Sequence, residues 1–258
     1  MKVVILCGGL GTRLSEETHL RPKPMVEIGD KPILWHIMKI YEKFGLNDFV
    51  LPLGYKGDYI KNFFLNYYNF NSDLFLSLGN NLIERNNSNV ENWKLSLVDT
   101  GLSTMTGGRL LRLKEYLKDS GTFMLTYGDG VSDIQISKLL SFHRSHGKLA
   151  TVTAVRPPVR FGELVLNNYK VERFEEKPQA KDGWVNGGFF VFEPEIFDLI
   201  KDDSTILERE PLEELTRRNE LMAFQHEGFW QCMDTIRDKD YLQDLWLKGK
   251  APWIQNSK

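Results

Sequence analysis

The sequence predicts an α/β fold in which helices cover both faces of a mixed, mostly parallel central sheet. Three observations predict it. Over the first 156 residues, short apolar runs rich in β-branched side chains alternate with segments of helical periodicity. Strand, helix and strand in this order imply right-handed crossovers, and hence parallel strands covered on both sides. After residue 156 the strands become shorter, which predicts antiparallel or mixed pairing.

Five apolar runs are predicted as strands of the sheet. They lie near residues 3, 48, 95, 123 and 150, and they read V-V-I-L, D-F-V-L-P-L, L-S-L-V, F-M-L-T-Y and A-T-V-T-A-V. Ligands of such sheets bind at the carboxyl ends of the strands. We therefore expect a site at that edge.

Four segments are predicted as helices. In P-I-L-W-H-I-M-K-I-Y (32–41) apolar residues recur at helical spacing, and Gly45 is suited to end the helix. Residues 136–147 repeat the pattern and also end on glycine. Residues 107–118 begin a further helix at two glycines, and a last helix is predicted from Arg237 to Lys248.

The later strands and the loops complete the prediction. The three shorter strands are V-R-F-G-E-L-V-L, K-V-E-R-F-E-E and N-G-G-F-F-V-F. The Asn-rich stretch at 79–89 is polar and turn-prone, so we expect an exposed loop there. A length of 258 residues is near the upper limit for one hydrophobic core, which predicts a single domain over residues 1–258.

Composition excludes several classes of function. With 41% apolar and 26% charged residues, and no apolar run approaching the roughly 18 residues of a membrane span, no membrane partner is expected. A net charge of -2 provides no surface for a nucleic-acid backbone, although a small anionic ligand needs only a few local cations. Cys7 and Cys232 are too few for a disulfide framework, and the apolar start is too short for a secretory signal, so we expect a cytoplasmic protein.

The first predicted strand runs directly into the glycine-rich segment G-G-L-G-T-R-L (8–14). Gly8, Gly9 and Gly11 leave backbone N–H groups unobstructed, and such a loop attracts anions, phosphate above all. The spacing matches neither a P-loop nor a dinucleotide-binding fingerprint. A tight turn under the sheet is the structural alternative.

Two cations near this loop favour a polyphosphate ligand. Arg13 follows the glycines, and two prolines in R-P-K-P-M (21–25) stiffen the backbone around Lys23. An arginine fork and a lysine point charge beside one anion site suit several phosphates better than one. Taken alone, Lys23 could equally be an ordinary solvated lysine.

These residues resemble the opening of the sugar-1-phosphate nucleotidylyltransferases, in which G-G-L-G-T-R-L is followed by P-K-P-M and G-x-K-P-I-L. Five later motifs extend the resemblance, in the same order, over essentially the whole chain. They are V-D-T-G-x-x-x-M-T-G-G-R-L (98–110), Y-G-D-G-V (127–131), E-K-P (176–178), N-G-G-F-F (186–190) and F-W-x-x-M-D-T-x-R-D (229–238). Within that family, the first and last of these are most similar to glucose-1-phosphate cytidylyltransferases.

The resemblance implies a Rossmann-like three-layer sandwich with a smaller antiparallel sugar-binding part. It also implies that CTP and glucose 1-phosphate are the partners, that Mg²⁺ is the cofactor, and that CDP-glucose and pyrophosphate are the products. The sugar phosphate is already largely dianionic at neutral pH, its second pKa being about 6, so no general base is required. In keeping with this, none of the five histidines lies in an arrangement typical of nucleophilic catalysis.

The resemblance also implies the site residues. As catalytic residues it implies Arg13, Lys23, Arg109 and Lys177. For nucleotide binding it implies Leu6, Cys7, Gly8, Gly9, Leu10, Gly11, Thr12, Arg13, Lys23, Thr104, Arg109, Gly128 and Asp129. For the sugar phosphate it implies Gly162, Glu176, Lys177, Asn186 and Gly187, and for the metal Asp129 and Asp234. Outside this context, either aspartate is also typical of a helix cap or a turn.

Several alternatives remain open at the level of sequence. Leu102 in the nucleotide loop and Cys232, where proline is expected, depart from the family pattern and put the choice among CTP, UTP and dTTP, and among hexose 1-phosphates, in doubt. A nucleotide-sugar-dependent glycosyltransferase is disfavoured because the sequence around Asp129 lacks D-x-D. A catalytically silent sensor is disfavoured because all the proposed charged residues are present. A homo-oligomer is expected, with the aromatic side chains of Tyr67, Tyr68 and Phe70 available for an interface.

Overall fold

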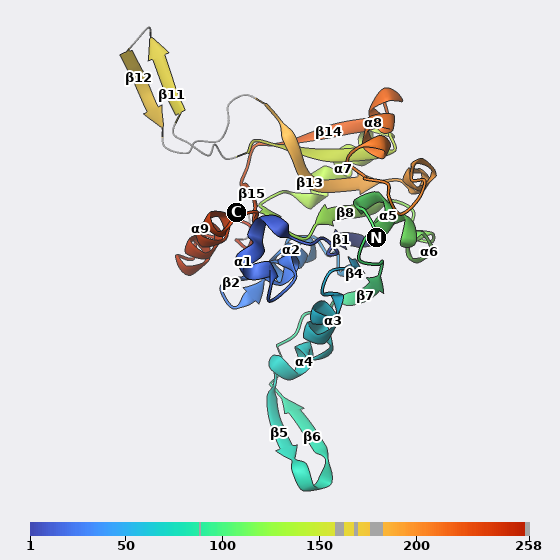
Figure 1. Ribbon diagram of the computed structural model, residues 1–258, viewed down its shortest axis with the longest axis vertical. Coiled ribbons are helices and arrows are strands. Elements are labelled where there is room, and N and C mark those ends of the chain that lie inside the picture. Colours follow the sequence, from blue (N-terminus) through green and yellow to red (C-terminus); the bar gives the residue numbers. More distant parts are fainter. Residues whose placement is uncertain (88, 158–162, 168–169, 176–182, 256–258) are drawn as a thin grey trace.

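The computed structural model describes residues 1–87, 89–157, 163–167, 170–175 and 183–255. Its centre is a seven-stranded sheet in the order β14-β10-β13-β8-β1-β4-β7 (Figure 1). These strands are β1 (Val3–Leu6), β4 (Asp48–Leu53), β7 (Lys94–Asp99), β8 (Phe123–Tyr127), β10 (Ala150–Val155), β13 (Val185–Phe192) and β14 (Leu221–His226). All five strands predicted for the first part of the chain are present.

Strand β13 is the exception in a sheet that is otherwise parallel. It pairs antiparallel with both β8 and β10, whereas β1 is parallel to β4 and β8, and β4 to β7. This confirms the predicted mixed, mostly parallel sheet. Because β13 runs in the opposite direction, its first residues lie at the edge where β1 and β8 end. Asn186 thereby approaches the carboxyl ends of the parallel strands.

Helices pack on both faces of the sheet, as predicted. The core on one face includes α2 (Ile33–Glu42), α7 (Ile136–His146) and α9 (Ile236–Leu247). The core on the other includes α5 (Thr106–Arg112), α6 (Lys114–Leu117) and α8 (Glu210–Arg217). Alternate residues of β1 point to opposite faces, with Val3 and Ile5 in the first core and Val4 and Leu6 in the second.

The segment predicted as one helix over 107–118 forms two short helices instead. The Leu113 N–H bonds to the Leu110 carbonyl at 3.0 Å, an i to i+3 bond that tightens the backbone between α5 and α6. The other predicted helices lie within a residue of their expected bounds, and Gly45 and Gly147 follow α2 and α7 with φ of 76° and 62°.

The remaining elements are short. The paired strands are β2 (Glu27–Ile28) with β3 (Lys31–Pro32), β5 (Asp73–Ser77) with β6 (Leu82–Asn86), β9 (Gly130–Ser132) with β15 (Trp230–Cys232), and β11 (Glu163–Asn167) with β12 (Lys170–Glu175). The helices are α1 (Ser15–Thr18), α3 (Gly57–Leu65) and α4 (Tyr67–Phe70), and the 3-10 helices are η1 (Thr12–Leu14), η2 (Lys23–Met25), η3 (Leu78–Asn80) and η4 (Pro194–Leu199).

The prediction of an exposed loop at 79–89 was wrong in part. Residues 82–86 form β6, which pairs antiparallel with β5 to make a hairpin that projects from α3 and α4 (Figure 1). Asn81 adopts a left-handed conformation with φ of 51° at the tip, so an asparagine signal marked a hairpin turn. All residues of β5 and β6 are exposed.

Of the three aromatic side chains expected to be exposed, two are. Tyr68 and Phe70 are 45% and 75% exposed. Tyr67 is partly buried instead, because its ring packs against Phe63, Phe64 and Trp93 and its hydroxyl donates to Glu91 at 2.6 Å.

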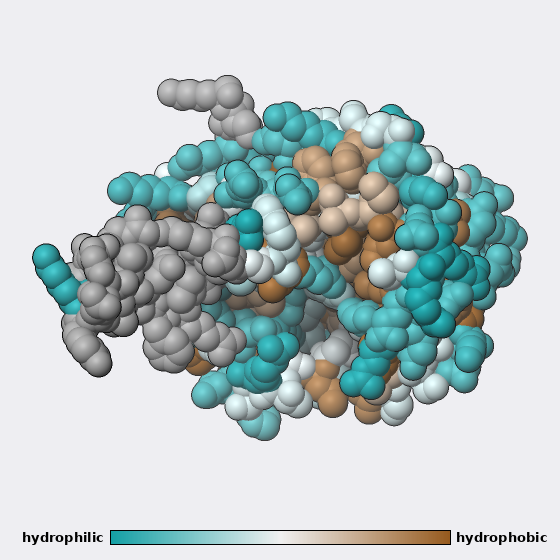
Figure 2. All heavy atoms as spheres, turned by 90° about the horizontal axis from the view of Figure 1, so that it is seen from above, coloured by the Kyte–Doolittle hydropathy of each residue, from teal (hydrophilic) through white to brown (hydrophobic). Residues whose placement is uncertain are grey.

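The view from above shows a largely hydrophilic surface, with hydrophobic residues near its centre and at parts of its rim (Figure 2). In the described part of the chain, no helix is long and apolar enough to cross a membrane.

Candidate active site

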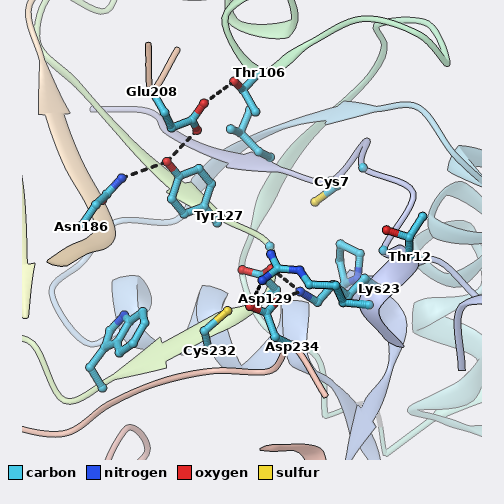
Figure 3. A pocket seen from close by; sticks show the side chains of 17 residues that line it. Cys7, Thr12, Lys23, Thr106, Tyr127, Asp129, Asn186, Glu208, Cys232 and Asp234 are labelled. Carbon is cyan, nitrogen blue, oxygen red and sulfur yellow. Dashed lines mark hydrogen bonds and ion pairs between the residues drawn. The ribbon is translucent and has the colours of Figure 1, made fainter. Parts of the chain in front are cut away.

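A cavity of about 510 Å³ opens at the edge where β1 and β8 end and β13 begins (Figure 3). Most of the residues singled out from the sequence meet in its wall. They are Leu6, Cys7, Gly9, Gly11, Thr12, Arg13, Lys23, Gly128, Asp129, Asn186 and Asp234. All five histidines are described, and none of them lines the cavity.

The glycine-rich loop needs its glycines for different reasons. Gly11 has φ of 65° and caps η1, with its carbonyl accepting from the Leu14 N–H at 3.0 Å. A side chain on Gly8 would collide with the guanidinium of Arg109, at 2.2 Å from the added Cβ. Gly9 faces open space and lines the cavity. Leu10, between them, is 52% exposed and lies outside the cavity wall.

Lys23 lies between two carboxylates. Its ammonium donates to Asp129 Oδ2 at 2.6 Å and to Asp234 Oδ1 at 2.5 Å. Arg13 reaches the same cluster, with NH1 2.7 Å from Asp234 Oδ2. The Lys23 residue is 9% exposed, whereas the Arg13 side chain is 73% exposed. The cavity therefore combines one buried cation with one exposed cation.

Two short strands bring the carboxylates together. Asp129 lies between β8 and β9, and β9 pairs with β15 so that Gly130 faces Cys232. The Met233 N–H then donates to the Asp129 carbonyl at 2.8 Å, which places Asp234 beside Asp129. Asp234 is held on its other side by the capping box of α9, where Asp238 Oδ2 accepts from the Asp234 N–H at 3.1 Å.

The charges of this cluster stabilise one another. Burial alone would lower the pKa of Lys23, but the charge of Asp129 and the hydrogen bonds to both carboxylates outweigh burial and raise it. For Asp234, burial raises the pKa, yet the hydrogen bond and charge of Lys23, with the charge of Arg13, lower it overall. Both groups are therefore ionised at neutral pH.

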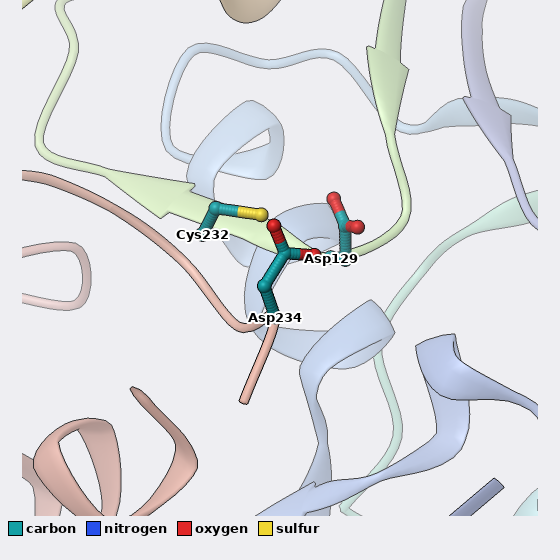
Figure 4. A group of neighbouring side chains, drawn as sticks. All are labelled: Asp129, Cys232 and Asp234. Atoms are coloured by element: carbon teal, nitrogen blue, oxygen red, sulfur yellow. The ribbon is translucent and has the colours of Figure 1, made fainter. Parts of the chain in front are cut away.

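The donor atoms of Asp129, Asp234 and Cys232 all lie within 4.8 Å of one another (Figure 4). Burial first, and then the charge of Asp129, raise the pKa of Cys232, so its thiol stays protonated and is a poor ligand. Two carboxylates without a thiolate suit a hard divalent cation such as Mg²⁺. The residues present fit that ion.

Arg109 and Thr104 lie outside the cavity wall. Arg109 is 4% exposed and lies behind the glycine loop, and Thr104 is 8% exposed. The guanidinium of Arg109 donates five hydrogen bonds of 2.7 to 3.2 Å, to the carbonyls of Gly8, Leu53, Gly101 and Leu102 and to the hydroxyl of Thr100. In this structure Arg109 joins the glycine loop to β4 and to the turn at 100–102.

The sugar side of the predicted site is described only in part. Asn186 lines the cavity and donates to the Tyr127 hydroxyl at 3.1 Å. The Gly187 carbonyl accepts from the indole of Trp230 at 2.8 Å. Gly162, Glu176 and Lys177 lie outside the described residues.

Six further residues line the cavity that sequence reasoning did not assign to a site: Pro24, Thr106, Tyr127, Glu208, Trp230 and Cys232. Five of them lie inside the recognised motifs, and two of these, Pro24 and Tyr127, directly adjoin assigned residues. Glu208 does not, and its surroundings, I-L-E-R-E-P, show only charges before a helix. Tertiary contact alone identifies it.

The whole sequence is similar to those of known nucleotidyl transferases. The sequence model of the family described as nucleotidyl transferase matches residues 2–238. Glucose-1-phosphate cytidylyltransferase of Salmonella typhimurium is 56% identical over 253 residues, which cover 98% of this chain and 98% of that protein. Mannose-1-phosphate guanylyltransferase catalytic subunit beta of Dictyostelium discoideum is 32% identical over 262 residues, covering 98% of this chain and 67% of that one.

Solved structures show the same fold. HddC from Yersinia pseudotuberculosis complexed with GMP-PN has a TM-score of 0.70 at 24% identity, over 95% of this chain and 99% of that chain.

Proposed function

The chain belongs to the nucleotidyl transferase family, and we propose that it transfers CMP from CTP to glucose 1-phosphate, giving CDP-glucose and pyrophosphate. The cytidylyltransferase relative is 56% identical over nearly the full length of both chains, against 32% for the guanylyltransferase. The main structural support for this reaction is the ammonium of Lys23, which bonds two carboxylates in the cavity wall beside the glycine loop.

In the proposed reaction an oxygen of the sugar phosphate forms a bond to the α-phosphorus of CTP. The bond from that phosphorus to the bridging oxygen of the leaving pyrophosphate breaks, and the electron pair departs with pyrophosphate. The barrier is electrostatic, because two anions must approach in line while charge grows on the leaving group. Cations in the cavity lower that barrier.

Each charged residue has a distinct part in this scheme. Lys23, buried and fixed, lies where the phosphates enter, and the exposed Arg13 can leave Asp234 to bind the outer phosphates. Asp129 and Asp234 would hold Mg²⁺, which when bound supplies positive charge shared among the phosphate oxygens. Lys23 bonds both carboxylates in this structure and would give up one of these bonds when they hold a cation.

Arg109 and the residues near the sugar complete the proposal. The five hydrogen bonds of Arg109 hold the glycine loop against the turn at 100–102, and we assign Arg109 to shaping the nucleotide pocket through that turn. From the family resemblance, Lys177 and Glu176 are assigned to the phosphate and hydroxyls of the sugar, with Gly162, Asn186 and Gly187 beside them.

The decisive experiment offers CTP, UTP, dTTP and GTP, each with Mg²⁺ and glucose 1-phosphate, and measures pyrophosphate release. We expect CTP to exceed the others in kcat/KM by at least about tenfold, equivalent to about 1.4 kcal/mol. Asp129→Asn with Asp234→Asn should abolish release while the protein remains folded. A higher kcat/KM with another triphosphate would replace the proposed base, and release undiminished in the double variant would refute the mechanism.

A homo-oligomer is part of this proposal. The β5–β6 hairpin projects from the molecule with its apolar side chains uncovered, and an isolated two-stranded hairpin is marginally stable in water. Exposed apolar side chains gathered on one surface element are typical of an interaction site. We assign it to a second copy of the chain. Its most exposed apolar residues are Leu78 at 88%, Phe75 at 58%, Leu76 at 57%, Leu82 at 52% and Ile83 at 47%.

A further inference from the structure

Glu208 lies across the cavity from the charged cluster. It belongs to the loop between η4 and α8, and it lines the cavity together with Thr106, Tyr127 and Asn186. Figure 3 shows these four side chains on one side and Lys23, Asp129 and Asp234 on the other. One end of the cavity therefore carries two cations paired with two carboxylates, and the other end carries the carboxylate of Glu208.

The carboxylate of Glu208 is held by two hydroxyls. Oε1 accepts from the Tyr127 hydroxyl at 2.6 Å, and Oε2 accepts from the Thr106 hydroxyl at 2.6 Å. Both donors belong to regular elements, Tyr127 to the end of β8 and Thr106 to the first residue of α5. Burial first, and then the charge of Glu208, raise the pKa of Tyr127, so the phenol stays protonated and remains a donor.

Tyr127 extends the network to the predicted sugar side. Its hydroxyl accepts from Asn186 Nδ2 at 3.1 Å while donating to Glu208. The side-chain oxygen Oδ1 of Asn186 in turn accepts from the Gly188 N–H at 2.8 Å, which fixes the orientation of the side-chain amide. Glu208 thus determines, through Tyr127, which groups Asn186 has left to offer a ligand.

The chemistry of this end selects hydroxyl groups. In the described part of the chain, no lysine or arginine forms an ion pair with Glu208, so its charge is not neutralised there. An ionised carboxylate only accepts hydrogen bonds and offers about four acceptor sites, of which Tyr127 and Thr106 occupy two. Phosphate oxygens are repelled from such a group, whereas sugar hydroxyls donate to it.

We propose that Glu208 is a specificity-determining residue for the sugar, accepting hydrogen bonds from hexose hydroxyls while orienting Asn186 through Tyr127. This inference rests on the proposed function, because it assigns the Glu208 end of the cavity to the sugar, and the end with Arg13, Lys23 and the proposed metal-binding carboxylates to the phosphates. It adds a hydroxyl-binding carboxylate to the site, from a loop that carries no family motif.

The test compares Glu208→Gln with the wild type. Substitution of the carboxylate should raise KM, and the Kd measured by calorimetry, for glucose 1-phosphate roughly 10- to 100-fold, as expected for loss of hydrogen bonds to a charged group. KM for CTP should change less than about twofold. Glu193→Gln is the matched control, because Glu193 also accepts from a threonine hydroxyl, at 2.8 Å, but lies outside the cavity wall.

A second measurement separates a direct contact from a structural role. In the wild type, one or two monodeoxy glucose 1-phosphates should bind more weakly than glucose 1-phosphate. In Glu208→Ala the ratio of the two Kd values should fall toward one. Equal discrimination among the deoxy sugars in both proteins would overturn the proposal, as would a parallel loss of CTP affinity. The assay is repeated with the sugar phosphate that the wild type binds most tightly. A preferred hexose other than glucose would correct the proposed function, and the role of Glu208 would still be tested with that sugar.

Discussion

At the scale of single residues, the ion pairs of Lys23 connect catalysis to stability. The side chains of Lys23, Asp129 and Asp234 are 11%, 24% and 17% exposed, so they are partly shielded from solvent. Removing one member of such a cluster leaves the remaining charges without an opposite charge. The resulting loss of folding free energy is larger than the net stabilisation that the intact cluster provides. Lys23 is therefore expected to influence both turnover and folding.

Lys23→Met keeps the length of the side chain and removes its charge. We expect kcat/KM to fall at least about 100-fold, because the phosphates lose a fixed cation. The free energy of unfolding should fall by about 1 to 3 kcal/mol at pH 7, since Asp129 and Asp234 then lose the ammonium that bonds both of them. Steady-state kinetics and urea unfolding measure the two effects, and a variant with wild-type turnover would contradict the role assigned to Lys23.

The pH dependence of that difference follows from the pKa shifts. The pKa of Asp234 is lowered, so its ion pairs stabilise the folded state above the unfolded value of about 3.9, and this is lost as the pH falls through the folded value. The pKa of Lys23 is raised, so its contribution is complete below about 10.4 and is lost only at higher pH. The stability gap between wild type and Lys23→Met should thus be constant from pH 6 to 9 and shrink below pH 4. An equal gap at pH 3 and pH 7, measured without divalent cations, would refute this assignment.

Arg13 should behave differently from Lys23. Its side chain is 73% exposed, so its ion pair with Asp234 contributes little to folding. We expect Arg13→Lys to lower kcat/KM about 10- to 100-fold, because a point charge cannot reproduce bidentate phosphate contacts, while the free energy of unfolding changes by less than about 0.5 kcal/mol. Kinetics equal to the wild type would show that Arg13 does not bind phosphate.

At the level of secondary-structure elements, α5 bonds three other segments: the loop that holds Glu208, the glycine loop and β4. The helix begins at Thr106, which bonds Glu208 in the cavity wall, and one turn later its Arg109 binds the glycine loop and β4 from behind. A side chain at Gly8 would occupy the volume of that guanidinium. Glycine at this position therefore leaves room for the guanidinium of Arg109.

Arg109→Lys tests this role at the level of the element. A lysine cannot reach all five oxygens. The carbonyls of Leu53 and Gly8 keep backbone donors, but those of Gly101 and Leu102 lose the Arg109 guanidinium, at a cost of about 1 to 3 kcal/mol each. We expect the free energy of unfolding to fall by at least about 2 kcal/mol, together with a rise in KM for CTP. Arg112→Lys is the control, because Arg112 belongs to the same helix as Arg109 but bonds the exposed Asp203. A loss of activity with unchanged stability would show that Arg109 acts on the substrate alone.

At the scale of the whole molecule, the β5–β6 hairpin determines the expected assembly. Leu76 and Ile83 face each other across the hairpin on one side, while Ser77 pairs with Leu82 on the other. A charge on the first of these faces should weaken association through the apolar side chains. The sheet and cavity lie elsewhere, so the fold of the monomer should persist.

The wild type is expected to elute as an oligomer in size-exclusion chromatography with light scattering. Leu76→Glu with Ile83→Glu should shift the mass toward the monomer. Ser77→Glu adds charge to the opposite face, which carries Phe75 and Leu82, and its effect shows how far that face contributes to the contact. Circular dichroism checks that all proteins are folded. A monomeric wild type, or an unchanged mass in the double variant, would exclude the hairpin as the interface.

Local sequence patterns were enough to predict the strands that coincide with short apolar runs, the helices α2, α7 and α9, and the glycine loop with its two cations. These features depend on periodicity and on the conformational freedom of glycine, which are visible within a short stretch of sequence. The contacts of Lys23 with Asp129 and Asp234 could be seen only in the folded chain, because these residues lie 106 and 211 positions further along it. Those contacts depend on the pairing of β9 with β15, and the contact of Glu208 with Tyr127 depends on where the loop before α8 packs. Such long-range contacts follow from the fit of surfaces formed by distant segments, and no local pattern encodes that fit.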